Sequence, residues 1–125
     1  MGPDTSFWKA IAQLLTSTAI LIDRPKGSSH PRYLEAIYPM DYGYLENTTS
    51  GDGGGIDVWL GSLSTVAHKE GAKMLTGILC TFDTLKRDAE IKLLIGCTKE
   101  DIQRIQEFHK EMLTLYIPNP VVTRI

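Results

Sequence analysis

Apolar residues near the start of the chain recur at the spacing of an α-helix. The segment FWKAIAQLL covers residues 7–15, and its large apolar side chains fall on one side of a helix: Phe7, Ile11, Leu14 and Leu15. Ser6 precedes this run and has a side-chain oxygen that can cap a helix. We therefore predict a short N-terminal helix that follows a polar, disordered lead at residues 1–6.

A longer helical pattern covers residues 98–116, near the end of the chain. Thr98 is a suitable N-cap, and Glu100 and Asp101 favour the positive end of the helix dipole in the first turn. Pro118 follows the pattern and ends the predicted helix. The face expected to be buried contains Ile102, Ile105, His109 and Met112.

Three shorter segments are rich in apolar and β-branched residues and predict strands. They are residues 18–23 (TAILID), 72–83 (AKMLTGILCTFD) and 89–97 (AEIKLLIGC). Residues 61–71 form a polar connection, and the charged turn TLKRD separates the last two strands. About four to six strands and two helices are expected in one domain that spans residues 1–125.

Composition narrows the classes of function. The formal net charge of −2 and the isoelectric point of about 5.9 argue against a nucleic-acid partner, which would leave a basic patch. Cys80 and Cys97 lack the spacing of a redox or zinc motif, so both are expected to be buried thiols. No stretch is long enough to span a membrane, and the start of the chain lacks a secretory signal pattern. A cytoplasmic protein without a membrane partner is therefore expected.

Candidate chemistry is densest in residues 38–60, YPMDYGYLENTTSGDGGGIDVWL. Its four glycines allow positive φ and a close approach of a ligand to the backbone. Asp52 and Asp57 flank this turn with carboxylate oxygens, which suit a hard cation. Tyr38 and Tyr42 add two phenolic hydroxyls at the beginning of the stretch.

This stretch resembles the signature of the soluble family I inorganic pyrophosphatases. In that family a Y-P-x-x-Y-G-Y run leads into a D-G-D-x-x-D metal motif and a hydrophobic strand. The resemblance extends over most of residues 20–110. It implies a mainly β fold with flanking helices (α+β): a small closed β-barrel of the oligonucleotide-binding type with a C-terminal helix. The chain departs from the pattern at Gly54, where the family has a central aspartate that accepts a proton from the attacking water or orients it.

The resemblance also implies a metal site for Mg²⁺ or Mn²⁺. The implied ligands are Asp52, Asp57 and Asp83, with either Asp88 or Glu90. Two registers are open because the family motif is D-x-x-x-x-D-x-K. Asp88 has the right separation from Asp83, whereas Glu90 is followed by Lys92 at the position of the family's lysine. The second register is preferred because IKLLIG then matches the family's strand, and on a strand all three side chains of Asp88, Glu90 and Lys92 share one face.

Five residues are the implied phosphate ligands: Arg32, Tyr38, Tyr42, Lys92 and Lys110. Arg32 replaces a lysine of the family and offers a planar fork to phosphate oxygens. Asp23 matches an acidic position, and His109 replaces a tyrosine, so both are further candidates. A lone histidine on an apolar helical face is more often a core residue. Residues 32–38 are shorter than the family norm, so a β-hairpin that supplies a second basic ligand is missing.

We therefore expect Mg²⁺-dependent hydrolysis of pyrophosphate to two phosphates by a metal-activated water, with Asp57 and Tyr42 as catalytic candidates. One alternative is a catalytically impaired module that binds phosphate or a nucleotide, which Gly54 favours. Others are a hydrolase of a related phosphoanhydride and an interaction protein with a relic site. A homo-oligomer is expected because the family forms oligomers and because Phe7 and Trp8 make the first helix very apolar.

Overall fold

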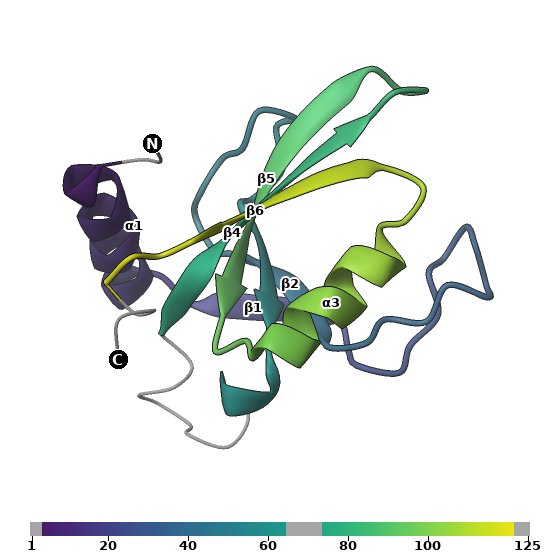
Figure 1. The fold of residues 1–125 in the computed structure, drawn as a ribbon, viewed down its shortest axis with the longest axis horizontal. Helices are drawn as coiled ribbons and strands as arrows, with labels where there is room; N and C mark the ends of the chain where they lie inside the picture. Colours follow the sequence, from purple (N-terminus) through teal and green to yellow (C-terminus); the bar gives the residue numbers. More distant parts are fainter. Residues whose placement is uncertain (1–3, 65–73, 122–125) are drawn as a thin grey trace.

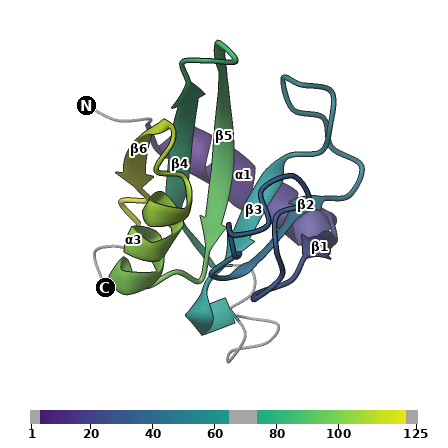
Figure 2. The same ribbon diagram turned by 90° about the vertical axis from the view of Figure 1, so that its right-hand side faces the viewer.

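A computed structural model describes residues 4–64 and 74–121 of the 125-residue chain. The helices and strands with both ends in these ranges are α1 (Thr5–Ser17), β1 (Ile20–Arg24), β2 (Asp41–Leu45), β3 (Asp57–Leu60), β4 (Leu75–Asp83), β5 (Asp88–Ile95), α3 (Lys99–Phe108) and β6 (Leu113–Pro118). The two helices lie on opposite sides of the sheet, with α3 in front and α1 behind in Figure 2 (Figures 1 and 2). The predicted α+β class is confirmed.

The six strands form one open sheet in the order β1-β2-β3-β5-β4-β6. Neighbouring strands are antiparallel except for β3 and β5, which are parallel and paired from Asp57↔Lys92 to Leu60↔Ile95. In the described residues β1 pairs only with β2, and β6 pairs only with β4, so the sheet has two edges. The prediction of a closed barrel is therefore wrong.

Burial along the central strands shows that the sheet is the middle layer of the fold. Val58 and Trp59 are consecutive in β3 and both fully buried, and residues 92–95 of β5 are all buried. Successive side chains of a strand point to opposite faces, so both faces of the sheet are covered. Because both faces are buried, consecutive residues of these strands are apolar, which explains the apolar runs in the sequence that predicted β4 and β5.

Helix α1 covers one face of the sheet. It is capped by Asp4, whose carboxylate accepts a hydrogen bond from the Phe7 N–H, and not by Ser6 as predicted. Residues 4–6 are therefore ordered, whereas residues 1–3 of the expected lead lie outside the described residues. The buried cluster on this face contains Trp8, Leu15, Leu45, Val58, Leu75, Ile78, Leu93 and Ile95. Because Trp8 is only 2% exposed, this side chain is used within the chain and does not indicate a partner subunit.

Helix α3 covers the other face together with the loop before β2. Its buried cluster contains Tyr38, Met40, Trp59, Leu79, Leu94, Cys97, Ile102 and Ile105. Among the described residues Cys80 and Cys97 are free cysteines, and Cys97 is buried while Cys80 is half-buried. None of the described helices has the length and apolar character needed to cross a membrane.

The C-terminal helix is shorter than predicted. Helix α3 ends at Phe108, with His109 as its C-cap, and the chain turns back as β6 along β4. The segment LTLYIP alternates in side-chain direction and is rich in β-formers, so pairing with β4 outweighs the continued helical spacing. Met112 therefore lies outside the helix.

Asp101 ties α3 to the turn after β3. Thr98 caps the helix as predicted, and Asp101 Oδ2 accepts hydrogen bonds from Thr98 N at 2.9 Å, Ser62 N at 2.9 Å and Ser62 Oγ at 2.8 Å. Burial raises the pKa of this carboxyl, but the hydrogen bonds from Thr98 and Ser62 outweigh it and hold the pKa below its ordinary value.

The Asp101→Ala variant should lower the free energy of unfolding by about 3 kcal/mol, because it removes a hydrogen-bonded charge and leaves buried donors unsatisfied. The matched control is Glu100→Ala, an exposed acid in the same turn, whose effect should stay within about 0.5 kcal/mol. Urea unfolding measures both. Equal midpoints for the two variants would contradict the role of Asp101.

Candidate functional site

The candidate site centres on the ammonium group of Lys92, a residue that is only 4% exposed. Lys92 Nζ donates hydrogen bonds to Tyr42 Oη at 2.8 Å, Asp57 Oδ2 at 3.1 Å and Glu90 Oε1 at 2.8 Å. An ammonium group has three N–H donors, so each donor has one acceptor. We call these four residues the Lys92 cluster.

Strand pairing brings the Lys92 cluster together from distant parts of the sequence. Asp57 is the direct partner of Lys92 across the parallel β3–β5 pair. Tyr42 lies on β2, one strand further along the sheet. Glu90 precedes Lys92 by two residues on β5 and therefore points to the same face. The structure thus places Glu90, rather than Asp88, beside the lysine.

Burial and charge decide the protonation states in the cluster. Burial raises the pKa of Tyr42, and nearby Asp57 adds to this effect, so the phenol stays neutral. Burial alone would lower the pKa of Lys92, but Tyr42, Asp57 and Glu90 more than compensate and hold the pKa above its ordinary value. The cluster therefore holds one positive charge beside two acidic side chains.

Asp52 extends the acidic side of the cluster. Its Oδ1 atom accepts hydrogen bonds from Ser50 Oγ at 2.6 Å and Gly54 N at 2.9 Å. These hydrogen bonds lower the pKa of Asp52, and a weaker interaction with Glu90 acts in the same direction. Asp52 thus lies next to Glu90 at the exposed rim of the site.

The glycines of the turn have different structural roles. Gly53 has a φ of +92°, which favours glycine, and a Cβ at Gly55 would lie 2.6 Å from Tyr44 Cδ2. Gly54 has neither constraint: its φ is outside the left-handed region, and a Cβ would meet only Asp52 Oδ1 at 3.4 Å, an ordinary contact. The backbone would therefore accept an aspartate at position 54.

The predicted metal ligands are only partly brought together. In residues 4–64 and 74–121 no three His, Cys, Asp or Glu side chains are grouped so as to hold a metal ion. Asp83 Oδ1 accepts hydrogen bonds from the backbone of Leu85 and Lys86 in the β4–β5 turn, and Asp88 is exposed at the start of β5.

The acidic residues near Lys92 nevertheless suit one Mg²⁺ ion. Lys92 contacts one oxygen each of Asp57 and Glu90, so the second oxygen of each is not bound to it. Mg²⁺ commonly takes one or two carboxylates and completes its shell with water and phosphate oxygens. These two carboxylates are fewer than those of the cage for several cations that the resemblance implies.

Basic side chains surround His30 of the loop before β2, and the ring of Tyr38 connects His30 to the cluster, 6.2 Å from the ring of His30 and 5.6 Å from that of Tyr42. Burial, followed by the charges of Arg24, Arg32 and Lys86, lowers the pKa of His30. His30 Nδ1 accepts hydrogen bonds from the backbone N–H of Arg32 at 3.0 Å and of Tyr33 at 3.3 Å, which hold the imidazole within the loop. Arg32 was a predicted ligand, whereas Arg24 and Lys86 were not.

Tyr38 lies between His30 and the cluster. Its buried ring packs 5.6 Å from that of Tyr42, and burial raises its pKa while interactions with Arg24 and Lys92 oppose the rise. Sequence reasoning could have found Arg24 from the density of basic residues in RPKGSSHPR. No comparable signal exists for Lys86, which the β4–β5 hairpin carries toward the loop.

The remaining predicted residues lie apart from the Lys92 cluster. Lys110 is exposed after the end of α3, with Nζ 3.6 Å from Glu107 Oε2. Asp23 is exposed on the edge strand β1. His109 is buried, with its ring 5.7 Å from that of Trp59, and its Nε2 has no hydrogen-bond partner among the described residues. His109 is thus a core residue.

Comparison with known proteins gives no match, either to a protein-family model or to a curated protein. The pyrophosphatase resemblance therefore rests on the motif residues alone, and any functional argument has to come from the geometry of the site.

His109 should make the stability of the protein sensitive to acid. Burial, and to a lesser extent the charge of Lys92, lowers its pKa from 6.5 to about 3. Between these pH values only the unfolded chain binds a proton at His109, so the free energy of unfolding falls as the pH drops, by about 1.4 kcal/mol per pH unit. The His109→Phe variant should therefore gain about 2 to 3 kcal/mol relative to the wild type between pH 6.5 and 4.5.

Urea unfolding at several pH values measures this difference. His30→Phe is the matched control, because His30 is only partly buried and should change the pH slope less. Parallel pH profiles for the wild type and His109→Phe would contradict a neutral, buried His109.

Proposed function

We propose that the protein hydrolyses pyrophosphate, or a related phosphoanhydride, with the help of a divalent cation. The observation that carries the proposal is the arrangement around Lys92, where a buried cation, a phenol and two carboxylates meet, and Tyr38 connects them to the basic side chains around His30. Phosphoryl transfer needs positive groups to hold the phosphates and carboxylates to hold a metal ion. Both kinds of group converge in this part of the fold.

The basic side chains fit the role of phosphate ligands. Lys92 and Tyr42 can donate to phosphate oxygens from the centre of the sheet, Arg24 from the end of β1 and Arg32 from the loop before β2. Asp57 and Glu90, with Asp52 at the rim, would hold Mg²⁺. The metal supplies polarisation of the phosphoryl group and a lowered pKa of the attacking water.

Full pairing of Lys92 has a consequence for binding. All three of its N–H groups are engaged, so Lys92 can donate to a phosphate oxygen only if it releases Tyr42, Asp57 or Glu90. A released carboxylate needs another cation to balance its charge. Pyrophosphate should therefore bind more tightly when a divalent cation is present.

Binding without turnover is the second candidate function, and Gly54 favours it. A positioned general base typically contributes about 10²- to 10⁴-fold to a rate, and position 54 has no side chain to act as one. The backbone leaves room for a carboxylate there. The two candidates can therefore be separated by restoring this group.

Phosphate release from pyrophosphate with Mg²⁺ should be slow in the wild type, lost in Asp57→Asn and at least about 10-fold faster in Gly54→Asp, because an added carboxylate can position the water. Calorimetric titration with pyrophosphate measures binding in the same samples. Binding without turnover in the wild type, with turnover in Gly54→Asp, would establish the binding module. Neither binding nor turnover in either protein would refute both candidates.

A matched pair of variants tests the placement of the acidic residues. Glu90→Gln should reduce phosphate release by about 10²-fold or more, because Glu90 contacts Lys92. Asp88→Asn, an exposed acid two residues away on the same strand, should leave the rate within about twofold. The reverse result would assign the metal to the register that uses Asp88.

A further inference from the structure

The two edges of the open sheet differ in how they are protected. On β1 the charged residues Asp23 and Arg24 lie at the edge, and the pairing register shifts between Ile22 and Arg24. Charges and bulges of this kind discourage pairing with another chain. On β6 residues 113–117 have no charge, and the register with β4 is regular from Gly77↔Pro118 to Phe82↔Leu113. Among the described residues, β6 is thus a regularly paired edge strand without these protections.

The same strand also exposes an apolar face. Leu113 and Leu115 are 64% and 59% exposed, and Phe82 on β4 and Ile91 on β5 are 45% and 47% exposed. Strand register places all four on one face, because Phe82 pairs with Leu113 and Cys80 pairs with both Leu115 and Ile91. Contiguous exposed apolar surface of this kind marks interaction sites in water-soluble domains.

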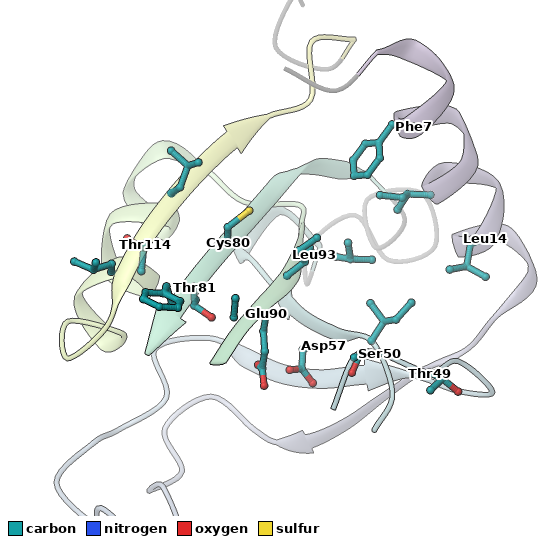
Figure 3. Close-up of a pocket in the computed structure, with 18 residues that line it drawn as sticks. Phe7, Leu14, Thr49, Ser50, Asp57, Cys80, Thr81, Glu90, Leu93 and Thr114 are labelled. Carbon is teal, nitrogen blue, oxygen red and sulfur yellow. The ribbon is translucent and has the colours of Figure 1, made fainter. Parts of the chain in front are cut away.

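This apolar face forms one wall of a groove that α1 borders on the other side (Figure 3). The groove has a volume of about 700 Å³, and Phe7, Ile11 and Leu14 of α1 line it opposite the sheet. Cys80 of β4 and Ile117 of β6 still pack against the buried cluster that contains Trp8 and Leu15, whereas Leu113 and Leu115 of β6, Phe82 of β4 and Ile91 of β5 remain exposed.

A binding partner for β6 has to pair with the backbone groups at its outer edge and pack beside its exposed leucines. An apolar small molecule could cover the side chains but would leave the outer N–H and C=O groups of the strand unpaired. Another strand would pair these backbone groups and place its own side chains beside Leu113 and Leu115. An uncharged strand can lie beside its own copy without like-charge repulsion, and antiparallel pairing of identical strands has the two-fold symmetry of most homodimers.

We propose that β6 pairs antiparallel with β6 of a second copy of this chain, so that one sheet continues through the dimer. The two-fold axis then runs perpendicular to the sheet, and Leu113 and Leu115 of both copies lie side by side on the same face. This interface uses β6 and not the α1 helix, and it does not depend on the proposed activity.

Light scattering coupled to gel filtration over a range of concentrations tests the assembly. The wild type should have a mass near twice the 13.9 kDa of the chain. Leu115→Lys should weaken the dimer at least about 100-fold, because it places two ammonium groups beside each other in an apolar interface. Leu115 is more than half exposed, so the monomer should still fold, which circular dichroism would verify.

Leu34→Lys is the matched control, since Leu34 is an exposed leucine on the loop before β2 and should leave the dimer intact. A monomeric wild type at millimolar concentration, or a Leu115→Lys variant that remains dimeric, would overturn the proposal. A monomer that retains an apolar small molecule in native mass spectrometry would also overturn it and assign the groove to a ligand.

Hydrogen exchange distinguishes strand pairing from other dimers. The backbone amides of residues 113–117 that do not bond to β4 should exchange at least about 10-fold more slowly in the dimer than in Leu115→Lys. A dimer in which these amides exchange as fast as in the variant would place the interface elsewhere and refute pairing through β6.

Discussion

The buried ammonium group of Lys92 is the interaction on which the candidate site depends. A charge in the interior is tolerated only when its partners are close and well oriented, since an unpaired one costs several kcal/mol. Lys92 meets this requirement with acceptors from three strands: Tyr42 on β2, Asp57 on β3 and Glu90 on its own strand β5. A shift of register between β3 and β5 would separate Asp57 from Lys92, so the charge helps to specify the parallel pairing of these two strands.

The same pairing limits what the site can do. In the described structure the lysine and the two carboxylates neutralise one another in part. The lysine is therefore not free to bind an anion by itself, and the carboxylates are not free to bind a cation by themselves. A ligand that brings both signs, such as a phosphate with a bound cation, can replace the internal pairs on both sides at once. The proposed hydrolysis of a phosphoanhydride with a divalent cation requires such joint binding of anion and cation.

Local patterns in the sequence predicted the elements whose hydrogen bonds or burial are local. Helix α1, the Thr98 cap and the buried runs of β4 and β5 belong to this class. The end of α3 could not be predicted from local pattern. The helical spacing continues through Met112, whereas pairing with the distant strand β4 makes residues 113–118 a strand. Ser6 was a plausible cap by residue type, but Asp4 has the position that reaches the first free N–H.

The sequence predicted which residues belong to the Lys92 cluster, but not which of the other candidate residues lie near it in space. Motif spacing found the whole Lys92 cluster, because the resemblance preserves residue order along the strands. It also included Asp83, whose carboxylate instead closes the β4–β5 turn, and Lys110, which lies exposed beyond α3. Arg24 and Lys86 were missed because their charges act on His30 from β1 and from the β4–β5 turn, two segments outside the motif. Which charges converge is decided by tertiary contacts that spacing does not encode.

Electrostatics also gives a physical reason for glycine at position 54. The backbone conformation and the surrounding space would accept a side chain there, so the absence of an aspartate is not a requirement of the fold. An aspartate would add a further negative charge beside Asp52 and close to Glu90, with Lys92 already fully paired. Without a bound cation this like-charge repulsion would destabilise the turn. Glycine at position 54 avoids this repulsion, at the expense of a group that could position water in the proposed reaction.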